Sequence, residues 1–238
     1  MTLDWQGAIE SVIHHPLFGI GITLGAYQWV LAAYERTRWI FLQPVLVSML
    51  LVIGVLLLTG VGYTEYRKST EILGTLLGPA TVALAVPLYL NLRRIRQLLV
   101  PTLATLVIGG VFATSLGLLL AWSFGAEHMI LMTLAPKSVT SPIAMLVAEQ
   151  IGGVAALAAV FVLITGVIGA IFGPALLSIL KVRSPAARGM ALGMTAHAVG
   201  TSVALQEGEE CGAFAALAMS LMGVSTAVFL PLAVSLFA

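Results

Sequence analysis

The chain has few charged residues, which make up 9% of its 238 residues, whereas 60% are hydrophobic. A soluble domain carries about 25% charged residues, because its surface faces water. Folded around a single aqueous core, a chain so poor in charge would leave large apolar patches outside. The shortage of charge therefore excludes an ordinary soluble protein and predicts a protein embedded in a lipid bilayer.

Cysteine is also scarce, because Cys211 is the only one. A single cysteine excludes an intrachain disulfide and a cysteine-rich metal site. The sequence shows no nucleophile with a neighbouring base and no phosphate-binding loop, so we expect no enzyme activity, cofactor, bound metal or nucleic acid. The pair His14 and His15 lacks further ligands nearby and is weak support for a metal site.

A basic segment is missing from the N-terminus, where Asp4, Glu10 and His14 precede the first apolar run. A cleavable signal sequence would carry basic residues there. We therefore expect the first helices themselves to direct insertion of a multi-pass protein into a bacterial inner membrane.

What the sequence does contain is long apolar runs. A hydrocarbon core about 30 Å thick needs roughly 20 helical residues to span it. Apolar runs of about this length predict spanning helices at 17–34, 39–60, 70–92, 98–124, 153–180 and 212–238. The predicted fold class is therefore an all-α polytopic membrane protein with about six spanning helices.

Two further runs, 129–148 and 188–206, are long enough to span but are interrupted in the middle. The first is broken by prolines and hydroxyl residues around Lys137, and the second by glycine and hydroxyl residues around His197. Such residues beside an ionisable side chain make a poor continuous membrane helix. We predict that both runs form re-entrant or broken helical hairpins.

The two interrupted runs also resemble each other, because an alignment without gaps puts Lys137 over His197 and Glu149 over Glu209. This similarity predicts an internal repeat, each unit comprising a hairpin and a spanning helix. We expect N-terminal transmembrane helices for scaffolding or oligomerisation over 1–97 and a transport-like core over 98–238, with an inverted repeat of 129–180 and 188–238.

Basic loops give the orientation of these hairpins. The positive-inside rule puts loops 93–96 and 181–188 in the cytoplasm. If 129–148 crossed the membrane, loop 181–188 would lie on the wrong side, so we expect 129–148 to enter from outside and 188–206 from the cytoplasm. A half-helix of about nine residues rises roughly 14 Å, so both tips reach the midplane. Interrupted helices in inverted repeats are typical of secondary transporters.

Lys137 and His197, at the predicted tips, are the sharpest candidates for binding. A cation in mid-membrane can receive a carboxylate, helped by the amides of a helix N-terminus. Alternatively, Lys137 extends to the outer interface or pairs with Glu149. His197 can donate to a carboxylate or carry a proton, or it is simply hydrogen-bonded in packing.

Other polar and small residues accompany these tips. Hydroxyl groups lie at Ser138, Thr140, Ser141, Thr201 and Ser202. They either bind a substrate or form hydrogen bonds with backbone groups left unpaired where the helix is interrupted. The hairpins end in Glu149, Gln150, Glu209 and Glu210, which we favour as interfacial caps. Alternatively, the gates or proton carriers are Glu149, Gln150 and Glu209. Residues that act as helix hinges and permit close packing are Gly78, Pro79, Gly173 and Pro174.

From about residue 40 to the end, the sequence resembles the LrgB/CidB family in four ordered motifs at 77–87, 136–144, 149–153 and 196–210. The resemblance implies a bacterial inner-membrane protein that acts with a small LrgA/CidA-type membrane partner. The family was first described as holin/antiholin-like and linked to control of murein hydrolases. Related proteins are associated with pyruvate uptake, and a plastid relative with glycolate and glycerate exchange.

Short monocarboxylates such as pyruvate or glycolate are thus the substrates that the resemblance implies. Combined with the predicted hairpins, it suggests a transporter, or a transporter subunit, that works by alternating access at the two tips and forms a homo-oligomer. The alternative is an antiholin-like regulator of a holin-type pore and of murein hydrolase activity, without transport of its own.

Overall fold

The computed structural model describes residues 10–37, 39, 42–83 and 85–237. Throughout these residues the regular structure is helical and no strand occurs, which confirms the all-α prediction. The chain divides after Ala83 into two compact units, each described here by itself.

Within its described residues, the N-terminal unit contains four helices of seven residues or more: α2 Phe18–Thr37, α3 Pro44–Thr59, α4 Tyr63–Ser69 and α5 Glu71–Ala83. Helix α2 packs against α3 and α4. Thr23 of α2 lies 2.9 Å from the Tyr66 hydroxyl of α4, and Gly19 approaches Ser69 so closely that a Cβ would not fit. A hydroxyl contact and a small residue thus join the two helices.

The C-terminal unit begins with two short helices and continues with six longer segments. The short helices are α6 Ala85–Leu90 and α7 Leu92–Gln97. The others are α8 Leu99–Ser123, α9 His128–Leu134, α10 Ser141–Gln150, α11 Ala155–Ile179, α12 Pro185–Glu207 and α13 Glu209–Phe237.

Three of these helices have the length and apolar composition that the predicted spans require. Helices α8, α11 and α13 are long and apolar enough to cross a membrane, and they correspond to the runs 98–124, 153–180 and 212–238. Helix α3 is apolar but has only 16 residues. Leu84, between α5 and α6, lies outside the described residues. Spans at 17–34, 39–60 and 70–92 therefore stay predictions.

Both predicted interruptions occur where the sequence indicates them. The first lies between the end of α9 at Leu134 and the start of α10 at Ser141. The second lies inside α12 at His197, whose backbone angles, φ 41° and ψ −126°, are far from helical. At the first, Pro136 and short hydroxyl residues disfavour a helix; at the second, the strained angles belong to a non-glycine residue.

Helix α12 folds back on itself at this break. The Arg188 guanidinium near its start donates to the Glu207 carboxylate at its end, at 2.6 Å from Nε and 2.8 Å from Nη2. In a straight helix, residues 19 positions apart lie about 28 Å from each other. The ion pair therefore requires that the two halves of α12 run in opposite directions.

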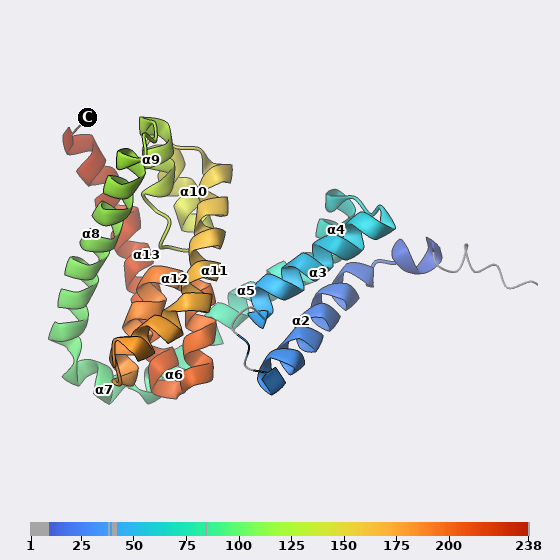
Figure 1. The fold of residues 1–238 in the computed structure, drawn as a ribbon, viewed down its shortest axis with the longest axis horizontal. Helices are drawn as coiled ribbons and strands as arrows, with labels where there is room; N and C mark the ends of the chain where they lie inside the picture. The colour runs from blue at the N-terminus through green and yellow to red at the C-terminus, as the bar shows by residue number, and fades with distance from the viewer. Residues whose placement is uncertain (1–9, 38, 40–41, 84, 238) are drawn as a thin grey trace, which may run out of the picture. The chain divides into compact units, whose positions relative to one another are not determined.

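The arrangement of the C-terminal unit follows from these reversals (Figure 1). Helix α8 leads to the end of the unit where α9 and α10 lie and where α11 begins. Helix α11 returns to the opposite end, where α12 starts and α13 begins its course back. Helix α12 packs extensively on both α11 and α13. The two interrupted segments thus enter the unit from its opposite ends.

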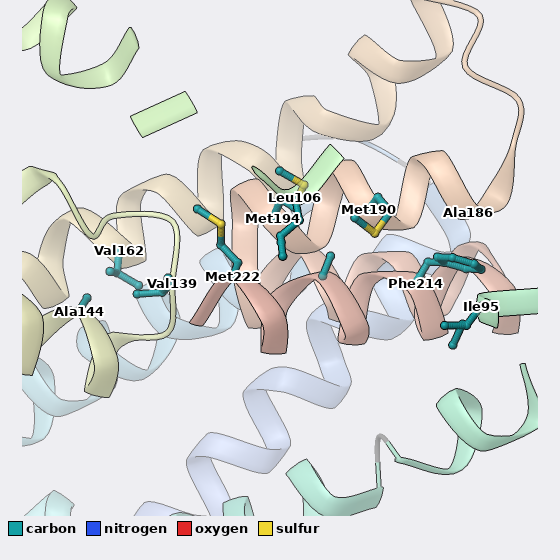
Figure 2. Close-up of a cluster of buried hydrophobic side chains, with 11 residues drawn as sticks. Ile95, Leu106, Val139, Ala144, Val162, Ala186, Met190, Met194, Phe214 and Met222 are labelled. Carbon is teal, nitrogen blue, oxygen red and sulfur yellow. The ribbon is translucent and has the colours of Figure 1, made fainter. Parts of the chain in front are cut away.

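A buried apolar cluster joins the first break to the longer helices (Figure 2). Val139 and Ala144 lie beside Val162 of α11, and Met222 of α13 lies nearby. By contrast, α8 turns large apolar side chains such as Ile108 outward. An exposed apolar surface of this kind fits contact with lipid, because water would not favour it.

Candidate functional site

The first break holds a partly buried cation. The Nζ atom of Lys137 donates to the carbonyl oxygen of Ala113 on α8 at 3.3 Å, and its aliphatic end lies against Gly117 one turn further along α8. Within the part of the chain described, Lys137 has no ion-pair partner, so it does not pair with Glu149 as the alternative interpretation required. An ammonium group has three donors, and two remain available.

Three hydroxyl groups belong to the same break, at the positions that follow Lys137 in the sequence. Ser138 is only 5% exposed, and Thr140 and Ser141 are half-buried. Among the described residues, none of the three hydroxyls has a hydrogen-bond partner. Thr140 precedes α10 without capping it, so the first amides of α10 also lack side-chain acceptors. The break therefore gathers donors that suit an anionic oxygen.

The second break is built differently, because one ring nitrogen of His197 and two hydroxyl groups bond to backbone carbonyls. His197 is 4% exposed and its Nε2 lies 2.9 Å from the carbonyl oxygen of Val162 on α11, so Nε2 is the ring's donor. Thr201 donates to the His197 carbonyl at 2.8 Å, and Ser202 donates to the Val199 carbonyl at 2.7 Å. These hydroxyls satisfy backbone groups at the break, as the structural alternative predicted for them.

The two breaks meet at one turn of α11. Val162 accepts the hydrogen bond from His197 through its carbonyl and packs against Val139 through its side chain (Figure 2). Lys137 lies two residues before Val139. In the described chain, no hydrogen bond or ion pair joins Lys137 directly to His197. Residues of both breaks, Val139 and His197, thus contact Val162 of α11. The Lys137 ammonium group bonds to α8.

The residues at the hairpin ends lie in different surroundings. Glu149 and Gln150 are exposed, and neither side chain has a partner among the described residues. Glu209 accepts from Asn91 Nδ2 at 3.3 Å, and Glu210 pairs with Arg94 at 3.1 Å. The acidic pair that begins α13 therefore binds the polar segment around α7.

Arg188 and Glu207 close the base of the second hairpin. Besides Glu207, the Arg188 guanidinium donates to the carbonyls of Val182 and Pro174 and to the hydroxyl of Ser178. The hydrogen-bonded carboxylate raises the pKa of Arg188 above its ordinary value. One side chain thus ties the end of α11 to both halves of α12, a role that sequence reasoning missed.

The predicted hinges lie inside helices. Pro79 and Gly78 fall within α5, and Pro174 falls within α11, which continues past it. A Cβ on Gly173 would lie 2.8 Å from Leu192 Cδ2 of α12, so this glycine does permit close packing. Across the described residues, no group of three or more metal-ligating side chains gathers.

Sequence reasoning also missed the residues that receive the two ionisable side chains. These are Ala113 and Gly117 on α8, and Val162 and Gly166 on α11. The acceptors are backbone carbonyls, which side-chain patterns do not reveal. The only signal available was a glycine inside each otherwise apolar run.

Comparison with known proteins decides the family. The sequence profile of the LrgB-like family matches residues 23–236. The chain belongs to the LrgB family. The predicted resemblance is therefore confirmed, and it begins earlier in the chain than residue 40.

Relatives of this LrgB-family membrane protein cover nearly its whole length. It is 39% identical over 216 residues to the uncharacterized protein YxaC of Bacillus subtilis, covering 91% of this chain and 94% of that one. It is 31% identical to the antiholin-like protein LrgB of the same organism, covering 93% and 96%. The antiholin-like protein LrgB of Bacillus cereus (strain B4264) is 30% identical, covering 91% and 95%. No solved structure matches the chain.

Proposed function

We propose that this protein is a transporter, or a transporter subunit, for small monocarboxylates such as pyruvate or glycolate in the bacterial plasma membrane. The observation that carries the proposal is the first break, where, among the described residues, the Lys137 ammonium group bonds only to the Ala113 carbonyl and the hydroxyls of Ser138, Thr140 and Ser141 have no partner. A carboxylate there gains charge-assisted hydrogen bonds in surroundings of low polarity, where they are stronger than in water.

The arrangement of the breaks supports transport by alternating access. Two interrupted segments enter from opposite ends of the C-terminal unit and meet at Val162. We propose that they form an inverted repeat of 129–180 and 188–238, re-entrant from opposite faces of the membrane. About six spanning helices, an N-terminal scaffold that mediates oligomerisation and a transport-like core complete the proposal.

The test is uptake of labelled pyruvate or glycolate by proteoliposomes containing the full chain. We expect saturable uptake whose kcat/KM falls about 100-fold in Lys137→Ala and stays intact in Lys181→Ala, a change at an exposed lysine of a loop. Uptake by wild type that is absent, or that does not saturate, contradicts a carrier. The measurement is repeated with an LrgA-type small membrane protein, because the transporter can be a two-component one.

The alternative function, favoured by the names of two relatives, is an antiholin-like regulator of a holin-type pore and of murein hydrolase activity. A regulator acts through its contacts with an LrgA/CidA-type partner and has no need of a ligand at the breaks. It predicts that partner binding and lysis phenotypes survive the double change Lys137→Ala and His197→Ala. Loss of uptake with an unchanged lysis phenotype favours the transporter.

A further inference from the structure

Each break presents its ionisable side chain to a glycine of a long helix. A Cβ added to Gly117 of α8 would meet the Nζ and Cε atoms of Lys137, the latter at 3.0 Å. A Cβ added to Gly166 of α11 would lie 2.7 Å from both Cε1 and Nε2 of His197. In both places, the polar end of the side chain occupies the space that any other residue would fill.

The hydrogen-bond acceptor has the same position relative to the glycine in both cases. Lys137 donates to the carbonyl of Ala113, four residues before Gly117, and His197 to the carbonyl of Val162, four residues before Gly166. In a helix that carbonyl already accepts from the glycine's own amide. It has a second lone pair, and a side chain can approach it closely over a glycine, because no Cβ stands in the way.

We propose that Gly117 is a positioning residue for Lys137. By lacking a side chain, it opens the Ala113 carbonyl to the ammonium group and holds that group in place, with two donors left for a carboxylate. Gly166 does the same for His197, which is an independent occurrence of the arrangement in the same molecule. The carboxylate part of this inference rests on the proposed function, whereas the positioning of the ammonium group does not.

Gly117→Ala is a mild change that tests the positioning. Within 4 Å its Cβ meets only the flexible end of Lys137, so the fold is not disturbed and the ammonium group alone has to leave. Gly109→Ala is the matched control, because it lies on the same helix and its Cβ would meet only the flexible end of Met194.

The first measurement needs no substrate. The purified full-length chain is treated briefly with acetic anhydride, and acetylation of Lys137 is compared with that of the exposed Lys181 by mass spectrometry. We expect the ratio of Lys137 to Lys181 acetylation to rise several-fold in Gly117→Ala and to stay at the wild-type value in Gly109→Ala. An unchanged ratio in Gly117→Ala overturns the inference.

The second measurement is pyruvate uptake by the same variants. We expect Gly117→Ala to raise the KM roughly tenfold, the size expected for one charge-assisted hydrogen bond, with kcat nearly unchanged. In a Lys137→Met background, Gly117→Ala should add nothing, whereas a general defect would persist there. If acetylation rises but the KM does not, positioning for the substrate is wrong; if Lys137→Met itself has no effect, the proposed function fails while the acetylation result still decides the rest.

Discussion

At the break between α9 and α10, the Lys137 ammonium group makes one hydrogen bond and three hydroxyls have no partner among the described residues, whereas at the break inside α12 one imidazole nitrogen and both hydroxyls bond to backbone carbonyls. The residue types are alike, yet their hydrogen bonds differ. Buried polar groups that are paired stabilise a structure, whereas accessible donors without a partner can bind a ligand. The difference fits our proposal that the first break binds a ligand while the second has a structural role.

The largest expected effect separates Lys137 from His197. Lys137→Met removes the charge that would bind a carboxylate, and we expect kcat/KM for pyruvate uptake to fall about 100-fold, equivalent to about 2.8 kcal/mol. His197→Gln keeps an N–H donor for the Val162 carbonyl, and we expect uptake to stay within about threefold, since one neutral hydrogen bond is retained. Uptake assays on both variants decide, and an equal loss removes the distinction between the breaks.

The second effect concerns the base of the second hairpin, where Arg188 pairs with Glu207 and both side chains are largely shielded from water. Arg188→Met leaves that carboxylate and several carbonyls without a donor, and we expect it to lower the free energy of unfolding by about 2 kcal/mol. The control is Arg93→Met, because Arg93 is exposed and has no ion-pair partner in the described chain. Thermal unfolding in detergent measures both, and equal melting temperatures would show that the pair does not hold the hairpin.

The smallest effect contrasts two hydroxyls. Thr201→Val frees the buried carbonyl of His197 and should lower the free energy of unfolding by about 1 kcal/mol. Ser138→Ala breaks no hydrogen bond, so stability should be unchanged while the KM for pyruvate rises a few-fold. Unfolding and uptake are measured on both variants. The opposite pattern, with Ser138 needed for stability and Thr201 for uptake, would reverse the roles of the two breaks.

Much of the C-terminal unit was predictable from sequence, because a helix that spans the lipid needs a long apolar run, and interrupting such a helix costs free energy. The runs 98–124, 153–180 and 212–238 became α8, α11 and α13. Pro136 and the small residues around His197 located both breaks to within a few residues. These features are local, and local composition determines them.

The pairings were not predictable, because they depend on how the chain folds back. Arg188 and Glu207 lie 19 residues apart; the hairpin predicted over 188–206 brings its two ends together but does not say which side chains pair. The partners of Lys137 and His197 are backbone carbonyls, which every residue carries. Sequence similarity between the two tips suggested equal roles, and only the hydrogen bonds distinguish them.

Ligand protection of single cysteines tests most directly whether the first break binds the substrate. In a Cys211→Ser background, Ser138→Cys and Ser202→Cys are alkylated by a small thiol reagent with and without pyruvate. The structure predicts that pyruvate slows alkylation at position 138 and leaves position 202 unchanged. Equal protection at both positions, or protection at position 202 alone, would contradict the account.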